Sequence, residues 1–72
     1  MTVRAKFQCE QVTTTAAGAE VLLHPVTGGS PENEQFFRYT PSGTIKLATV
    51  NLEAAQQFVP GKPYYVDFIP AE

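Results

Sequence analysis

The sequence predicts a β-rich α+β fold: a small, four-stranded, mainly antiparallel curled sheet or barrel with one or two short helices. Apolar and polar residues alternate at the start of the chain, which is typical of a strand that is buried on one face. Clusters of glycine and proline divide the remainder into short segments. With 72 residues, 43% of them hydrophobic and 17% charged, the chain suits a single compact domain over residues 1–72.

The first two segments predict an antiparallel hairpin. The strand from Val3 to Thr14 alternates until Val12 breaks the phase, so we expect a bulge near Glu10-Gln11. A small-residue loop over residues 13–18 then leads into a second strand, Ala19 to Val26.

The middle of the chain predicts a short helix and a third strand. Two glycines precede Ser30, a good N-cap, and Pro31 suits the first helical position, so one or two helical turns are expected from Pro31 to Phe37. A proline-glycine turn over residues 40–43 then precedes a strand from Thr44 to Val50.

The last part predicts a second helix and a fourth strand. Asn51 can cap a helix from Leu52 to Phe58, which Pro60-Gly61 ends, and its apolar side is expected to cover the end of the sheet. The final strand runs from Pro63 to Pro70. Its alternation places Tyr64, Val66 and Phe68 on one face and Tyr65, Asp67 and Ile69 on the other.

The single cysteine and single histidine limit the chemistry of the chain. Cys9 has no second cysteine for an intrachain disulfide, which favours a reducing compartment, and two ligands are too few for a structural zinc site. Cys9 lies among apolar strand positions and is expected to be a small buried residue, although the reactivity of its thiol stays open. His24 is expected to point outward at the end of a strand. We therefore predict no metal and no cofactor.

Three segments stand out by their order and spacing: Ser30-Pro31-Glu32-Asn33, Thr40-Pro41-Ser42-Gly43 and Phe58-Val59-Pro60-Gly61-Lys62-Pro63-Tyr64-Tyr65-Val66-Asp67-Phe68. Together they resemble a pattern in an uncharacterised family of small tailed-bacteriophage proteins. The resemblance implies a virus-encoded protein that works in the virion or in the host bacterial cytoplasm. The family has no assigned activity, so the resemblance transfers no functional residues. Residues 1–20 contain no apolar stretch typical of a secretory signal, so the protein is not expected to be secreted.

Catalysis is not expected from these residues. Ser30 and Ser42 are explained by helix capping and turn formation, and neither stands in a nucleophile motif. Glu32 and Glu34 are two apart, so on a helix their side chains do not face each other. The glycine-rich segment lacks the Lys-Ser/Thr ending of a phosphate-binding loop. We predict that the protein is not an enzyme.

Protein binding explains the aromatic residues best. Adjacent aromatics, such as Phe36-Phe37 and Tyr64-Tyr65, cannot both face the core from one strand. Tyrosine and arginine are also favoured interface anchors. A free edge strand ending at Pro70 is a further expected contact, either with a partner or with a second copy of the chain. The predicted partner-binding residues are Phe37, Arg38, Tyr39, Tyr65 and Ile69.

Nucleic-acid and membrane partners are disfavoured. Arg4 and Lys6 point the same way from the first strand, and Lys46 would join them in a basic face beside the aromatic cluster. However, five basic against seven acidic residues give a net charge of −2, which is weak for a polyanion groove. The longest aliphatic run is Val21-Leu22-Leu23, too short to span a bilayer.

The sequence thus predicts a non-enzymatic protein that acts by macromolecular binding. A virion accessory role, decorating or cementing a capsid lattice, is slightly favoured, since many weak identical contacts add up on such a lattice. An inhibitor of a bacterial host protein is the first alternative, and a single-stranded nucleic-acid binding module is the second. The identity of the partner and the oligomeric state stay open.

Overall fold

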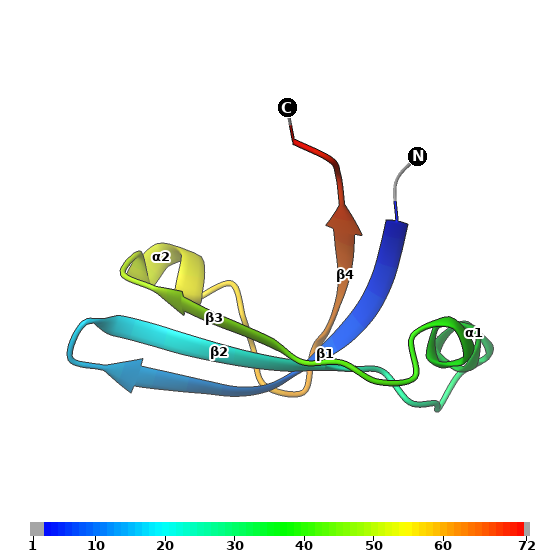
Figure 1. Cartoon of the computed structure of the whole chain (residues 1–72). Coiled ribbons are helices and arrows are strands. Elements are labelled where there is room, and N and C mark those ends of the chain that lie inside the picture. Colours follow the sequence, from blue (N-terminus) through cyan, green and yellow to red (C-terminus); the bar gives the residue numbers. More distant parts are fainter. Residues whose placement is uncertain (1–2, 72) are drawn as a thin grey trace.

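In the computed structural model, which describes residues 3–71, four antiparallel strands form one sheet in the order β3-β2-β1-β4 (Figure 1). The predicted curled sheet with two short helices is confirmed. The sheet stays open, because β3 and β4 lie at opposite edges and do not pair with each other. The elements are β1 (Val3–Thr15), β2 (Gly18–Pro25), α1 (Pro31–Tyr39), β3 (Ile45–Thr49), α2 (Leu52–Ala55) and β4 (Pro63–Phe68).

The β1–β2 hairpin contains the predicted bulge. Cys9 lies opposite Leu23 and Gln11 lies opposite Leu22, so Glu10 is the extra residue of β1. The bulge restores the phase of the strand, and Val12 lies opposite the buried Val21.

The loop predicted over residues 13–18 is wrong in its first half. The three threonines extend β1 and pair with β2 as far as Thr15 opposite Gly18, because β-branched residues favour extended backbone. Only Ala16 and Ala17 form the turn. Gly18 has φ +148, and a Cβ there would lie 2.2 Å from the carbonyl oxygen of Thr49, so the close approach of the end of β3 requires glycine.

The helices are capped as predicted but differ in length. The Ser30 hydroxyl accepts a hydrogen bond from the Asn33 amide, and α1 continues two residues beyond the predicted Phe37. The Asn51 side chain accepts from two amides at the start of α2, which ends at Ala55 and not at the predicted Phe58. After Ala55, the amides of Gln57 and Phe58 donate hydrogen bonds to carbonyls three residues earlier, so the chain continues as a tighter turn before Pro60.

The sheet bends sharply along β1, which gives the molecule an L-shaped profile (Figure 1). We call β4 and the paired residues 3–8 of β1 the arm. The face inside the angle is the concave face, and the opposite face is the outer face. α2 lies over β2 and β3 at the far end of the concave face, whereas α1 lies outside the angle, next to the arm. The buried cluster lies on the concave face and consists of Ala5, Phe7, Cys9, Val21 and Leu23.

Candidate binding surfaces

A polar cluster joins α1 to the outer face of the arm. Arg4 donates two hydrogen bonds to the Asp67 carboxylate, at 2.7 and 2.9 Å, and its guanidinium lies 5.0 Å from the centroid of the Tyr65 ring. Glu32 of α1 accepts from Lys6 at 2.6 Å and from the Tyr65 hydroxyl at 2.8 Å. Since alternate residues of β1 and β4 share a face, strand pairing alone brings these sheet residues together.

The cluster is electrostatically balanced. The hydrogen bonds from Lys6 and Tyr65 lower the pKa of Glu32, and the hydrogen bond from Arg4 lowers the pKa of Asp67. The hydrogen bond to Glu32 raises the pKa of Tyr65. The cluster therefore pairs the basic side chains of Arg4 and Lys6 with two carboxylates. The contacts of Glu32 with Lys6 and Tyr65 connect α1 to the arm.

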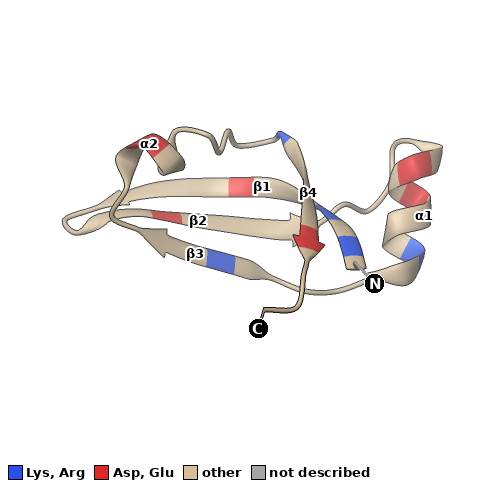
Figure 2. Cartoon of the chain, turned by 90° about the horizontal axis from the view of Figure 1, so that it is seen from above, with Lys and Arg blue, Asp and Glu red and all other residues tan. Residues whose placement is uncertain are grey.

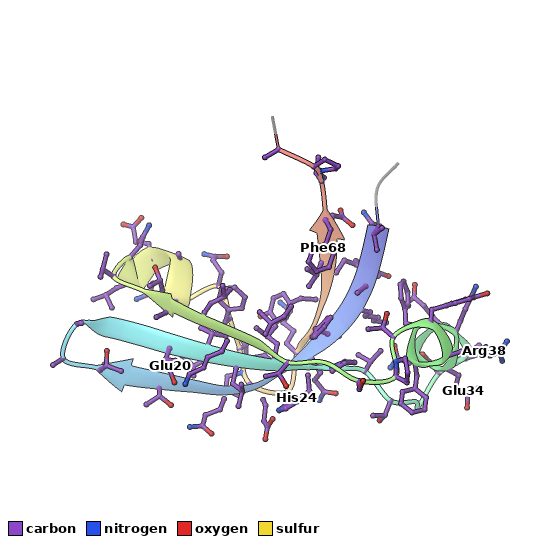
Figure 3. The ribbon with its side chains drawn as sticks, in the orientation of Figure 1. Glu20, His24, Glu34, Arg38 and Phe68 are labelled. Carbon is purple, nitrogen blue, oxygen red and sulfur yellow. The ribbon has the colours of Figure 1, made fainter. Side chains whose placement is uncertain are left out.

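Three of the predicted binding residues are consecutive in the last turn of α1, where their side chains point in different directions around the helix. No residue of α1 is buried, and the side chains of Phe37, Arg38 and Tyr39 are all exposed, with Tyr39 at 75%. Figure 3 shows Arg38 pointing away from the sheet. We call these three residues the α1 surface. Beside them a shallow hollow of about 370 Å³ is lined by Arg4, Glu32, Gln35, Phe36 and Tyr39.

The other two predicted binding residues lie apart from the α1 surface. Tyr65 lies on the outer face of β4, with its ring 6.1 Å from that of Phe36, and its hydroxyl is bound to Glu32. It contributes to holding α1 on the sheet. Ile69 follows the end of β4 and is 73% exposed. The strand predicted to reach Pro70 ends earlier, because the described ladder with β1 ends at Val3 opposite Phe68.

Each cation of the predicted basic face is paired with a carboxylate. Arg4 binds Asp67, Lys6 binds Glu32, and the Lys46 ammonium lies 3.5 Å from Glu20. Figure 2 shows basic and acidic positions interspersed along the strands and α1. The positive charge that would attract a phosphate backbone is therefore balanced locally.

Cys9 and His24 lie where the sequence predicts. Cys9 is buried, and burial raises the pKa of its thiol, which makes the thiol a poor nucleophile at neutral pH. His24 points to the outer face, where it contacts the carboxylate of the bulged Glu10 (Figure 3). Within residues 3–71, no group of three or more His, Cys, Asp or Glu side chains is placed to hold a metal ion. None of the helices in this part of the chain has the length and apolar character needed to cross a membrane.

An apolar groove on the concave face is the feature that sequence reasoning missed. It has a volume of about 560 Å³ and lies between the two edge strands, with Phe68 54% exposed and Leu47 47% exposed. The alternation of the last strand predicts an apolar face, but only the open sheet leaves that face uncovered. The groove is lined by Leu23, Ile45, Leu47, Phe58, Tyr64, Tyr65, Val66, Asp67 and Phe68.

Comparison with known proteins gives no match to a protein-family model, to a curated protein or to a solved structure.

Proposed function

We propose that this protein is a non-enzymatic binding protein that docks another macromolecule on the α1 surface, and that its role is that of a virion accessory protein on a bacteriophage capsid. The observation that supports binding is the exposure of two aromatic side chains and an arginine on a helix that is hydrogen-bonded to the arm. Tyrosine, phenylalanine and arginine are enriched at protein interfaces, and few other groups give as much binding energy per residue.

The way α1 is held supports this proposal. Glu32 and Phe36 contact side chains of the arm, and these contacts connect the helix that carries the α1 surface to the sheet. Docking residues on an ordered helix lower the entropy cost of binding. The segments that resemble tailed-phage proteins support the capsid role, and repeated weak contacts on a lattice would suit so small a surface.

The first experiment is mass spectrometry of purified virions of the encoding phage, with the copy number measured against the major capsid protein. We expect on the order of hundreds of copies per virion, as for a protein that occupies a repeated position of the capsid lattice. Its absence from virions would overturn the capsid role. A host-protein inhibitor using the same surface would then be sought by capture from infected cells.

A binding assay tests the surface itself. Capsids lacking the protein are titrated with the wild-type chain and with a variant carrying Arg38→Ala and Tyr39→Ser. We expect the variant to bind at least about tenfold more weakly. Val50→Ser is the matched control, since Val50 is exposed but lies outside α1, just after β3. Equal binding of all three proteins would exclude the α1 surface.

A further inference from the structure

The chain exposes more surface than a compact monomer of its mass. Its accessible surface is 5380 Å², whereas a folded monomer of 7.9 kDa exposes about 4400 Å² by the usual scaling. The radius of gyration is 13.2 Å, against about 11 Å for a compact domain of this length. The excess, about 1000 Å², is close to the roughly 800 Å² that each partner contributes to a standard protein interface.

The angle between the arm and the rest of the sheet contains part of this exposed surface. The groove there is apolar, and side chains on both of its walls are half exposed, Leu47 on β3 and Phe68 on β4. Val3, opposite Phe68 in the ladder, is 59% exposed. Figure 3 shows Phe68 within this angle. Neither helix fills it, because α2 covers only the far end and α1 lies outside.

The charges of the chain allow a second copy to enter this angle. Among the described residues that line the groove, only Asp67 is charged, and its carboxylate is turned to the outer face, where Arg4 holds it. The other ion pairs of the sheet also lie on the outer face, including Lys46 with Glu20. The described lining of two such grooves can therefore meet without bringing like charges together, although each chain carries a net charge of −2.

We propose that two copies of this chain pack concave face against concave face about a twofold axis, with the arm of each copy seated in the angle of the other. The L-shaped profile makes the surface self-complementary, because the arm is both the projecting part and one wall of the groove. In such an interface each contact occurs twice, and Phe68 of each copy meets Leu47 of the other. The α1 surface stays on the outside, so the dimer is independent of the proposed capsid contact.

Sedimentation equilibrium of the full chain measures the mass over a range of concentrations. We expect twice the 7.9 kDa of one chain. Phe68→Glu and Leu47→Lys should each raise the dimer dissociation constant by at least about 30-fold, since each removes a central apolar contact twice per dimer. Tyr39→Ser is the control and should leave the dimer unchanged, because Tyr39 lies on α1.

Mixing the two groove variants makes the test specific to this arrangement. A heterodimer of the Phe68→Glu and Leu47→Lys chains has one native contact and one Glu–Lys pair, so we expect it to form where each variant alone is monomeric. The proposal is overturned by a wild-type monomer at all concentrations, by a wild-type dimer that neither variant weakens, or by variants that do not associate with each other. Even if a variant fails to fold, a monomeric wild-type chain at all concentrations still overturns the proposal.

Discussion

On the outer face of the arm, Arg4 is opposite Asp67, Lys6 is opposite Tyr65, and Glu32 of α1 completes the hydrogen bonding. On the concave face of the same two strands, Val3 is opposite Phe68, and both side chains stay largely exposed. The outer face is thus completed within one chain, whereas the concave face is not. Polar pairs can be satisfied by one strand neighbour and one helix, but an apolar surface needs a second layer across its whole width.

The two faces can be compared most directly at adjacent leucines of β2. Leu23 is buried beneath the groove, and Leu22 is half-buried on the outer face. We expect Leu23→Ala to lower the free energy of unfolding by about 3 kcal/mol, since it leaves a cavity in a small core, and Leu22→Ala by about 1 kcal/mol or less. Chemical denaturation followed by circular dichroism measures both. Equal losses would mean that the concave face is not the main core.

Variants at the two helix caps allow a comparison of α2, which lies over the concave face, with α1, which lies beside the outer face. Asn51→Ala should cost about 1–2 kcal/mol, because Asn51 caps two amides of α2 and α2 places the buried Ala55. Ser30→Ala should cost about 1 kcal/mol or less, because α1 has no buried residue and Glu32 also holds it. Thermal unfolding measures the stability of the two variants. Ser30→Asn and Asn51→Ser are the conservative controls, because each keeps a side chain that can cap a helix. A larger loss at Ser30 would contradict this order.

Two adjacent tyrosines of β4 provide a smaller contrast. The Tyr64 hydroxyl, on the concave side, donates to the Gln57 carbonyl and accepts from the Val59 amide, which fixes the segment after α2. Tyr64→Phe should therefore cost about 1 kcal/mol. Tyr65→Phe removes one hydrogen bond to an exposed carboxylate and should cost less. Amide hydrogen exchange of Val59 should rise only in Tyr64→Phe, and a rise in both variants would show that the tyrosines are coupled.

The smallest expected effect is the acid dependence of the outer face. Arg4 lowers the pKa of Asp67 in the folded chain, so the ionised pair stabilises the fold at neutral pH. This contribution is lost as the pH falls from about 4 through the lower pKa of the folded state. Asp67→Asn and Arg4→Gln should flatten the acid limb of stability against pH by similar small amounts, as measured by thermal unfolding. An unchanged acid limb in both variants would exclude the pair as a stabilising contact.

The sequence predicts the strands well because each carries its own pattern. The alternation around Phe7 gives β1, and the phase change at Val12 gives the bulge that the structure has. The helix caps are equally local, since Ser30 and Asn51 act on amides within three residues. The predicted ends of the strands are wrong where pairing with a neighbouring strand sets them. Thr15 is extended because it pairs with Gly18 of β2.

The surfaces are harder to predict, because they depend on contacts between distant segments. Tyr65 is predicted to bind a partner, yet the chain itself uses its hydroxyl through Glu32, 33 residues away. Phe37 and Tyr39 are correctly placed outside the buried cluster, although their role stays a prediction. The groove could not be found from the alternation of β4 alone, since the same pattern would suit a closed barrel.

The bulge at Glu10 has a consequence for insertions and deletions in this chain. It lies where the arm ends and the flat part of the sheet begins, and bulges bend the strand that carries them. Without Glu10, β1 would alternate regularly from Val3 to Val12, and every side chain would keep its face. We therefore expect the loss of this one codon to reduce the bend of β1 while the alternation of its core residues is kept. A single extra residue in the longest strand would then determine whether the groove of the proposed dimer exists.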